Sequence, residues 1–478
     1  MFKQLKYLNP TIYLAALMTI SAVLCFFCIH EGHVWGDDFA LYIAQSKAIL
    51  DGTTADLYQK NVYLTDNSEI LEGGPIGPYL YPIGFPLLLS DVYWLKGMDL
   101  MSMKIFCTLF FILSLPLIYN LFSTRFLNKK YSLLLTAYVG LNFAIIVFTD
   151  NILSDFPFFF FMFLSLYLIE KNRLNIGYQL LLSAAIIMSY LIRDIGLVLM
   201  PVLIVQLYFK AQEIEENTFN YFKKNSLFIV PIALFCVFFL LKSVFLKADN
   251  TNLFTALSAA NFKTILSNAG YYVYVLGELF NANSNYILRS IILFLLGLFF
   301  LNGIYKSEKR DRHFILLIVL TMGLYIVFPG RQGLRYLFAI VPFIFYFSIK
   351  GILDMPFSFF KQFNNAILIG LVIYIGGNSV YNSIKFKEIK TDEITTPEAV
   401  DLYKWLEINT LPSDIIAFKK PRLLRLMTGR NGFSNSDDTK VLQSTANYLI
   451  EYDKPMRINS AFKSIYQNKF FIVYSINH

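Results

Sequence analysis

Long apolar runs alternate with short polar segments along most of the chain, and this pattern predicts membrane-spanning helices. A run of roughly 20 apolar residues crosses the hydrocarbon core of a bilayer as an α-helix. Some of the runs are shorter than this, so tilted or merged spans are compatible with the pattern. The runs lie at about 10–29, 103–122, 131–149, 156–170, 176–192, 195–210, 226–246, 286–305, 314–329, 336–352 and 364–380. We therefore expect an all-α polytopic domain of about eleven transmembrane helices over residues 1–380.

Residues 381–478 have a different pattern, which predicts a small α/β domain. The segment TPEAVDLYKWLEIN starts with Thr-Pro and continues with helical spacing of its apolar residues. The segment PRLLRLMTGR predicts a second helix that ends at Gly429. The short apolar runs in DIIAF, NYLIEYD and FFIVYSI are typical of strands.

Composition agrees with a bilayer as the main solvent. The 478 residues are 56% hydrophobic and only 15% charged, whereas soluble domains carry about 25% charged residues. The net charge of +8 could indicate a nucleic-acid partner, but the sequence has no basic stripe and no motif of a nucleic-acid-binding fold. The four cysteines all lie inside apolar runs, so we interpret them as packing residues and not as a metal site or a disulfide framework.

The distribution of basic residues predicts the orientation in the membrane. Cytoplasmic loops of membrane proteins carry an excess of Lys and Arg. If the N-terminus is cytoplasmic, the inner segments hold Lys3, Lys6, Arg125, Lys129, Lys130, Lys171, Arg173, Lys210, Lys223, Lys224, Lys306, Lys309, Arg310, Arg312, Lys350 and Lys361. The outer side then receives the first loop 30–102, the loop 247–285, the turns near 150, 194 and 332, and the tail 381–478. We therefore expect the tail on the outer side of the membrane.

The first outer loop begins with two adjacent carboxylates in the stretch WGDDFALYIAQSKAIL. Apolar residues recur at helical spacing after Asp38, which predicts a helix along the membrane surface. Asp37 could be no more than the N-cap of this helix. Capping needs one carboxylate and not two, however, and a pair of adjacent carboxylates can also accept protons or bind a metal ion.

Further charged residues are predicted at the same outer face. FTDNILSDFPFFFF holds Asp150 and Asp155 at the outer end of one span. SYLIRDIGLVLMP places Arg193 beside Asp194, a pair that could simply be an ion pair. FPGRQGLRYLFAIVPF adds two more arginines, Arg331 and Arg335. The planar guanidinium fork suits phosphate, so together these segments indicate a site that handles an anionic group.

In order and predicted side, these segments resemble the GT-C glycosyltransferases, the superfamily of protein O-mannosyltransferases and lipid A aminoarabinose transferases, and within it the bacterial branch that modifies envelope glycans. The stretch YPIGFPLLL resembles the Pro-rich entry to the family's second span. The positions that match the family's motifs are Asp37, Asp38, Tyr42, Asp155, Arg193, Gly196, Arg335, Tyr336 and Pro342. This chain departs from the pattern at Asp194, which could neutralise Arg193.

The resemblance implies an inverting transfer of a hexosyl or pentosyl group from a polyprenyl-phosphate donor to a hydroxyl of an envelope glycolipid, polysaccharide or protein. It also implies the bacterial cytoplasmic (inner) membrane, with the tail on the periplasmic side. It implies Asp37 as the general base and arginines as contacts of the leaving phosphate. Candidates for that phosphate contact are Arg193, Arg331 and Arg335. Asp38, Asp155 and Glu72 are candidates for orienting the acceptor or for holding a divalent cation, and Tyr42 and Tyr336 for binding substrate.

Two other functions remain open at this stage. A flippase or transporter of a lipid-linked sugar would need a polar path inside the membrane, and the predicted spans carry no acidic relay. A polymerase of envelope polysaccharide would also have outer arginines, but it would not need the Asp-Asp pair directly after the first span. The pattern does not specify the sugar or the acceptor.

Overall fold

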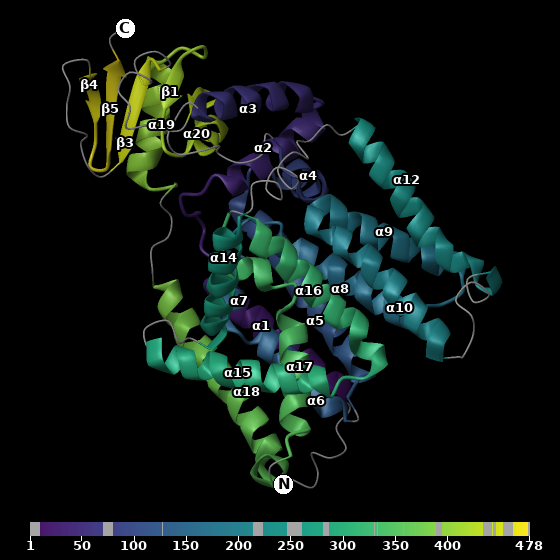
Figure 1. The fold of residues 1–478 in the computed structure, drawn as a ribbon. Helices are drawn as coiled ribbons and strands as arrows, with labels where there is room; N and C mark the ends of the chain where they lie inside the picture. Colours follow the sequence, from purple (N-terminus) through teal and green to yellow (C-terminus); the bar gives the residue numbers. More distant parts are fainter. Residues whose placement is uncertain are drawn as a thin grey trace. The chain divides into compact units, whose positions relative to one another are not determined.

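The structure of the protein is a computed structural model (Figure 1). It describes residues 10–69, 80–126, 128–213, 223–245, 261–280, 286–328, 330, 331, 333–356, 358–388, 394–433, 442, 446–452 and 462–476. Glu72, one of the predicted substrate-binding residues, lies outside these ranges.

Every predicted span coincides with helical structure. The helices are α1 (Pro10–Cys28), α5 (Leu100–Ser123), α6 (Lys129–Gly140), α7 (Phe143–Ile146), α8 (Asp155–Lys171), α9 (Ile176–Ile192), α10 (Leu199–Glu213), α12 (Val230–Phe245), α14 (Phe262–Val275), α15 (Tyr286–Tyr305), α16 (Arg312–Val327), α17 (Val341–Leu353) and α18 (Ser358–Lys387). Short 3₁₀ turns accompany them, among them η2 (Val147–Asp150), η3 (Asp194–Val198), η5 (Leu276–Phe280) and η7 (Leu334–Leu337).

Length and apolar composition make the chain a multi-pass membrane protein. Within the described residues, five helices are long and apolar enough to cross a bilayer, and a sixth span results if α6 is combined with the segment Phe143–Asp150. These two pieces meet at 49°. At the bend, the Asn142 side chain accepts from Ala144 N–H, a backbone donor at the start of α7, and also donates to the carbonyl of Leu279 in η5. The count of eleven spans stays a prediction.

Helices α15 and α17 cross each other (Figure 1), and two glycines allow their backbones to approach closely. A Cβ atom on Gly303 would lie 1.8 Å from the carbonyl oxygen of Phe347, and one on Gly351 would lie 1.8 Å from that of Phe299. Small residues at such crossings allow close backbone approach between membrane helices. The Asn302 side chain adds a 2.8 Å hydrogen bond to the carbonyl of Gly351.

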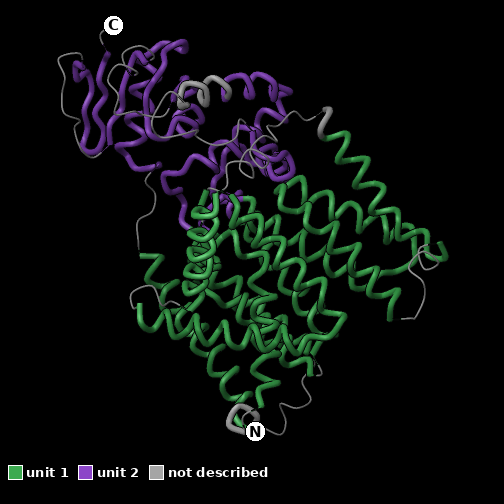
Figure 2. The backbone as a smooth tube through the Cα atoms, viewed as in Figure 1, with its two compact units in different colours: residues 1–29, 105–149, 154–388 green, residues 30–104, 150–153, 389–478 purple. Residues whose placement is uncertain are grey.

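The chain divides into two compact units, each assembled from separate parts of the sequence (Figure 2). Unit 1 consists of residues 1–29, 105–149 and 154–388 and holds most of the apolar helices. Unit 2 consists of residues 30–104, 150–153 and 389–478. The first predicted outer loop and most of the predicted tail therefore belong to the same unit.

Unit 2 contains a five-stranded sheet flanked by helices. Its strands are β1 (Ile415–Ala417), β2 (Asn431–Phe433), β3 (Tyr448–Tyr452), β4 (Phe462–Gln467) and β5 (Phe471–Ile476), in the order β2-β1-β3-β5-β4. β1 is parallel to β2 and β3, whereas β5 is antiparallel to β3 and β4. The helices of unit 2 include α2 (Asp38–Asp51), α3 (Thr54–Glu69), α4 (Gly84–Lys96), α19 (Pro397–Asn409) and α20 (Pro421–Thr428).

The predicted α/β character of the tail is confirmed, and the structure contains two strands that were not predicted. The predicted helices correspond to α19, which Thr396 caps, and to α20, which ends at Gly429 in the left-handed conformation. Three predicted strands correspond to β1, β3 and β5. The two strands that were not predicted are β2, which has three residues including a glycine, and β4, in which three successive residues are exposed. Neither has the apolar alternation that identifies a strand.

Trp35 links the first loop to the sheet inside unit 2. Its indole packs against one hydrophobic cluster of the sheet, with ring centroids 5.8 Å from Phe418, 5.9 Å from Tyr452 and 5.7 Å from Phe471. Aromatic side chains of this size contribute much of the apolar area of a core. The residue two positions before the acidic pair is thus part of the core that the C-terminal strands build.

Candidate functional site

Asp37 lies at the start of α2, but its carboxylate does not cap the helix. It occupies the N-cap position without a capping hydrogen bond from its side chain. The carboxylate instead accepts the backbone N–H of Leu423, near the start of α20, in a long hydrogen bond of 3.4 Å. Within unit 2, the interpretation of Asp37 as a helix cap alone is therefore not supported.

Asp38 is held by a tyrosine from the Pro-rich stretch. The hydroxyl of Tyr81 donates to Asp38 at 2.6 Å, and the Tyr81 ring lies 4.5 Å from that of Tyr42. Gln45 fixes Tyr81 through both of its backbone groups, at 2.9 and 3.0 Å. Burial, followed by the charge of Asp38, holds the pKa of Tyr81 well above its usual value, so the phenol stays protonated and keeps donating to Asp38.

Basic residues of the tail face this acidic pair. Arg422, the second residue of α20, is buried and lies over the Tyr81 ring at 5.9 Å. Burial raises the pKa of Asp37, whereas Arg422 and then Lys420 act to lower it. Desolvation dominates, so this carboxylate binds a proton more readily than an exposed aspartate does. No functional residue was predicted in the tail, although the first two of the three arginines in PRLLRLMTGR, Arg422 and Arg425, could have pointed to one.

A buried ion pair fixes the loop that leads to Asp37. Lys104 is fully buried, bonds Asp150 at 2.6 Å, and donates to the backbone carbonyls of His30 and Gly32. Asp150 also bonds the ring of His30 at 3.0 Å. His33 is buried and stacks on Phe39 at 3.8 Å, and burial lowers the pKa of its imidazole to about 4. Both histidines therefore serve the architecture of unit 2.

In unit 1, the arginine of the predicted basic turn pairs with Asp155 and not with its neighbour. Arg193 forms an ion pair with buried Asp155. Asp194 bonds Lys242 instead, at 2.8 Å, and the Lys242 ammonium lies 4.0 Å from the Tyr190 ring. The suggested Arg193–Asp194 pair is thus wrong, because Lys242 of α12 provides a countercharge for Asp194 that the sequence alone could not place.

Arg193 and Arg335 both lie near the ring of Tyr336. Their guanidinium carbons are 4.8 and 5.8 Å from its centroid, and Tyr336 stacks on buried Tyr325 at 4.7 Å. Cation–π contacts of this kind hold guanidinium groups in place over the face of an aromatic ring. Unit 1 therefore gathers four predicted residues, Asp155, Arg193, Arg335 and Tyr336.

Gly196 is required by the turn that presents Arg193. A Cβ atom at this position would lie 2.6 Å from backbone atoms of Ser189 and Tyr190, so η3 packs directly on the end of α9. Any larger residue would displace the turn.

Arg331 is tied to helix α14 of unit 1. Its guanidinium donates to Asn268 at 2.9 Å and to Ser267 at 2.5 Å, and it lies 4.9 Å from the Tyr271 ring. The structure thus places Arg331 against α14, while Arg335 is the arginine near Tyr336.

Among the residues that the structure describes, the predicted side chains do not form a metal site. Across the described ranges, no group of three or more His, Cys, Asp or Glu side chains is arranged to hold a metal ion. Asp38 and Asp155 have protein partners, Tyr81 and Arg193. The described side chains thus do not fit a divalent cation.

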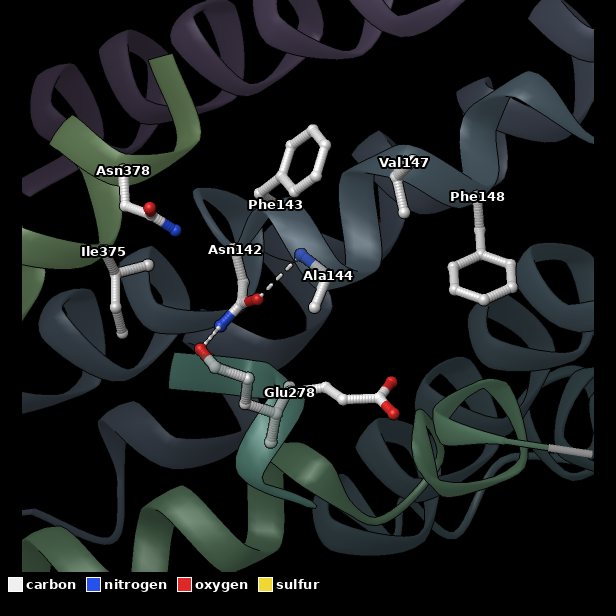
Figure 3. A pocket seen from close by; sticks show the side chains of 9 residues that line it. Asn142, Phe143, Ala144, Val147, Phe148, Glu278, Ile375 and Asn378 are labelled. Atoms are coloured by element: carbon white, nitrogen blue, oxygen red, sulfur yellow. Dashed lines mark hydrogen bonds between the residues drawn. The ribbon is translucent and has the colours of Figure 1, made fainter. Parts of the chain in front are cut away.

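Unit 1 also holds a cavity of about 160 Å³ (Figure 3). The Glu278 carboxylate and the amides of Asn142 and Asn378 line it together with apolar residues, Phe143, Ala144, Val147, Phe148, Leu279 and Ile375. Its lining includes none of the predicted site residues.

Comparisons with known proteins identify the fold. No protein-family model and no curated protein sequence matches the chain. Solved structures do match. ArnT from Cupriavidus metallidurans, bound to undecaprenyl phosphate, is 10% identical with a TM-score of 0.59, and the match covers 98% of both chains.

Two further structures agree. The oligosaccharyltransferase AglB from Archaeoglobus fulgidus, in complex with an inhibitory peptide and a dolichol-phosphate, is 9% identical with a TM-score of 0.54, covering 93% of this chain and 70% of that one. The arabinofuranosyltransferase AftD from Mycobacteria is 9% identical with a TM-score of 0.50, covering 98% and 40%. The chain therefore has the fold of the GT-C glycosyltransferases, as the resemblance of its motifs predicted.

Proposed function

We propose that this protein is an inverting glycosyltransferase that moves a sugar from a polyprenyl-phosphate donor to an acceptor hydroxyl at the outer face of a bacterial cytoplasmic membrane. The observation that carries the proposal is the Asp37 carboxylate, which is not used as a helix cap and has a raised pKa. The undecaprenyl phosphate bound by ArnT and the dolichol-phosphate bound by AglB support a lipid phosphate as the carrier.

In the proposed reaction, the acceptor oxygen attacks the anomeric carbon while the bond from that carbon to the phosphate oxygen breaks. Asp37 takes the proton of the acceptor hydroxyl, and polyprenyl phosphate leaves as an anion. General-base catalysis of this kind contributes roughly 10²–10⁴-fold. Arg193 and Arg335 are proposed to stabilise the developing phosphate charge, with Tyr336 holding both guanidinium groups.

Asp38 and Tyr42 are proposed to orient the acceptor beside the base. Tyr81 donates to Asp38, and a carboxylate can accept several hydrogen bonds at once, which suits a group that orients a sugar hydroxyl. Asp155 is proposed to orient Arg193 through their ion pair. Glu72 stays a candidate from the sequence alone.

The first test asks whether the protein transfers a sugar at all. Envelope glycolipids, polysaccharides and glycoproteins from cells with and without the gene are compared by mass spectrometry. We expect one product to lose one sugar residue in the deletion strain. Loss of an entire glycan, with its precursor retained on the inner leaflet, would instead support a flippase and contradict the proposal.

The second test concerns the base. Asn has nearly the size of Asp, and its amide oxygen can still accept the backbone N–H of Leu423, so Asp37→Asn removes basicity and little else. We expect normal membrane abundance, retained binding of undecaprenyl phosphate, and product formation reduced by roughly 10²-fold or more. Near-normal turnover by the Asp37→Asn variant would show that Asp37 is not the general base. A defect found in Asp38→Asn alone would transfer the role to Asp38.

A further inference from the structure

The start of helix α20 faces both carboxylates of the acidic pair within unit 2. Leu423, its third residue, donates its backbone N–H to Asp37. Arg422, its second residue, lies over the ring of Tyr81, whose hydroxyl donates to Asp38. Helix α20 is nearly four hundred residues away from the acidic pair along the chain. It nevertheless contacts Asp37 directly through a backbone N–H, and it contacts Tyr81, the hydrogen-bond donor of Asp38, through Arg422.

The burial of Arg422 calls for a role. Its side chain is only 4% exposed, and a buried guanidinium costs free energy unless opposite charge surrounds it. A leucine would fill the same space without that cost. The carboxylate of Asp37 supplies negative charge here. It accepts the backbone N–H of Leu423, the neighbour of Arg422, and the positive charge of Arg422 acts to lower its pKa.

The second arginine of α20 has a different role. Arg425 donates to the side chain of Asn61 at 2.8 Å and to the carbonyl of Lys60 at 3.0 Å. It thereby attaches α20 to α3, whereas the basic residues that act on Asp37 are Arg422 and Lys420. The same short helix therefore offers a test residue and a matched control of the same type.

We propose that Arg422 is a positioning residue for the Asp37–Asp38 pair, so that helix α20 of the C-terminal segment forms part of the active site. The inference rests on the proposed glycosyl transfer. Two adjacent carboxylates repel each other, and a fixed opposite charge holds them in one arrangement. The charged groups facing Asp37 are Asp38 on α2, Arg422 on α20, and Lys420 directly before α20. The phenols of Tyr81 and Tyr42 are the titratable groups near Asp38.

The test compares Arg422→Gln, Arg422→Lys and Arg425→Gln in full-length protein. Product formation is measured against pH in isolated membranes, which carry the cell's own donor and acceptor. We expect Arg422→Gln to lower the rate about 10- to 100-fold, because a small misplacement of a reacting group costs rate on that scale. The acidic limb of the pH profile should move to higher pH, since lost positive charge favours the protonated carboxylate. Arg422→Lys, which keeps the charge, should recover most of the rate.

Three outcomes separate this inference from its alternatives. Arg425→Gln should lower the unfolding temperature while leaving the pH profile and the rate per folded molecule near wild type. Equal loss of stability and rate in Arg422→Gln and Arg425→Gln, with unchanged pH profiles, would reduce Arg422 to a structural residue and overturn the proposal. Normal rate in Arg422→Gln beside an inactive Asp37→Asn would overturn it while the proposed function stands. An active Asp37→Asn variant would remove the proposed function, and this inference with it.

Discussion

At the scale of single residues, the local environment of Asp37 decides what this carboxylate can do. An exposed N-cap aspartate is solvated and fully ionised near neutral pH. Asp37 is instead partly desolvated, accepts one backbone N–H of α20, and lies among Asp38, Lys420 and Arg422. This environment favours a group that takes up a proton during turnover.

The raised pKa of Asp37 predicts the pH dependence of turnover. A general base works only when it is deprotonated, so activity is present above its pKa and is lost as pH falls through that value. Because burial raises the pKa, the loss should begin at higher pH than the value of about 3.9 of a free aspartate would give. The measurement is the acidic limb of product formation in isolated membranes. A limb centred at or below that value would contradict the assignment.

The guanidinium of Arg335 is expected to matter through its shape as well as its charge. Arg335→Lys keeps a positive charge but loses the planar fork of donors and the face that lies near Tyr336. We expect both Arg335→Lys and Arg335→Ala to weaken binding of undecaprenyl phosphate, by about tenfold for loss of one charge-assisted hydrogen bond. Thermal stabilisation of purified protein by added undecaprenyl phosphate provides the measurement. Wild-type binding by both variants would show that Arg335 is not a phosphate ligand.

At the scale of elements, the crossing of α15 and α17 depends on glycine. A methyl group on Gly351 would lie 1.8 Å from the carbonyl oxygen of Phe299, so the helices would have to separate. Overpacking of this kind costs typically about 1–3 kcal/mol. We therefore expect Gly351→Ala to lower the unfolding temperature in detergent.

Gly297 provides the control for this crossing. It lies on α15, and a Cβ atom at this position would meet no atom of the described residues within 4 Å. Gly297→Ala should leave the unfolding temperature unchanged or raise it, because Ala is favoured over Gly in a helix by about 1 kcal/mol. If Gly351→Ala were as stable as Gly297→Ala, the close crossing would be wrong.

At the scale of the whole molecule, the predicted orientation places the C-terminal segment outside the cytoplasm. It follows from the concentration of Lys and Arg in alternate segments between apolar runs. A periplasm-active reporter fused after His478 should be active, and a cytoplasm-active reporter at the same position inactive. The reverse result would show that the orientation is opposite to the predicted one, and it would contradict a site on the outer face of the membrane. A fusion after Lys361, predicted to be cytoplasmic, is the internal control.

Helix positions could be predicted from the sequence because they depend on local pattern. Apolar run lengths located α1, α15 and the other membrane helices, and Thr396 and Gly429 marked ends of α19 and α20. Short strands such as β2 could not be predicted, since their pairing partners lie elsewhere in the chain. The pairing of Asp194 with Lys242 was hidden for the same reason, because nearly fifty residues separate them.

By itself, the sequence determined the membrane class, the helix positions and the acidic and basic motifs that match the GT-C pattern, because bilayer thickness and helix geometry act on consecutive residues. Only the tertiary structure decided which charges meet. It paired Arg193 with Asp155, buried Trp35 in the C-terminal core, and brought α20 to the acidic pair. These contacts join distant segments, and a charge acts over a few ångströms of space whatever the separation along the chain.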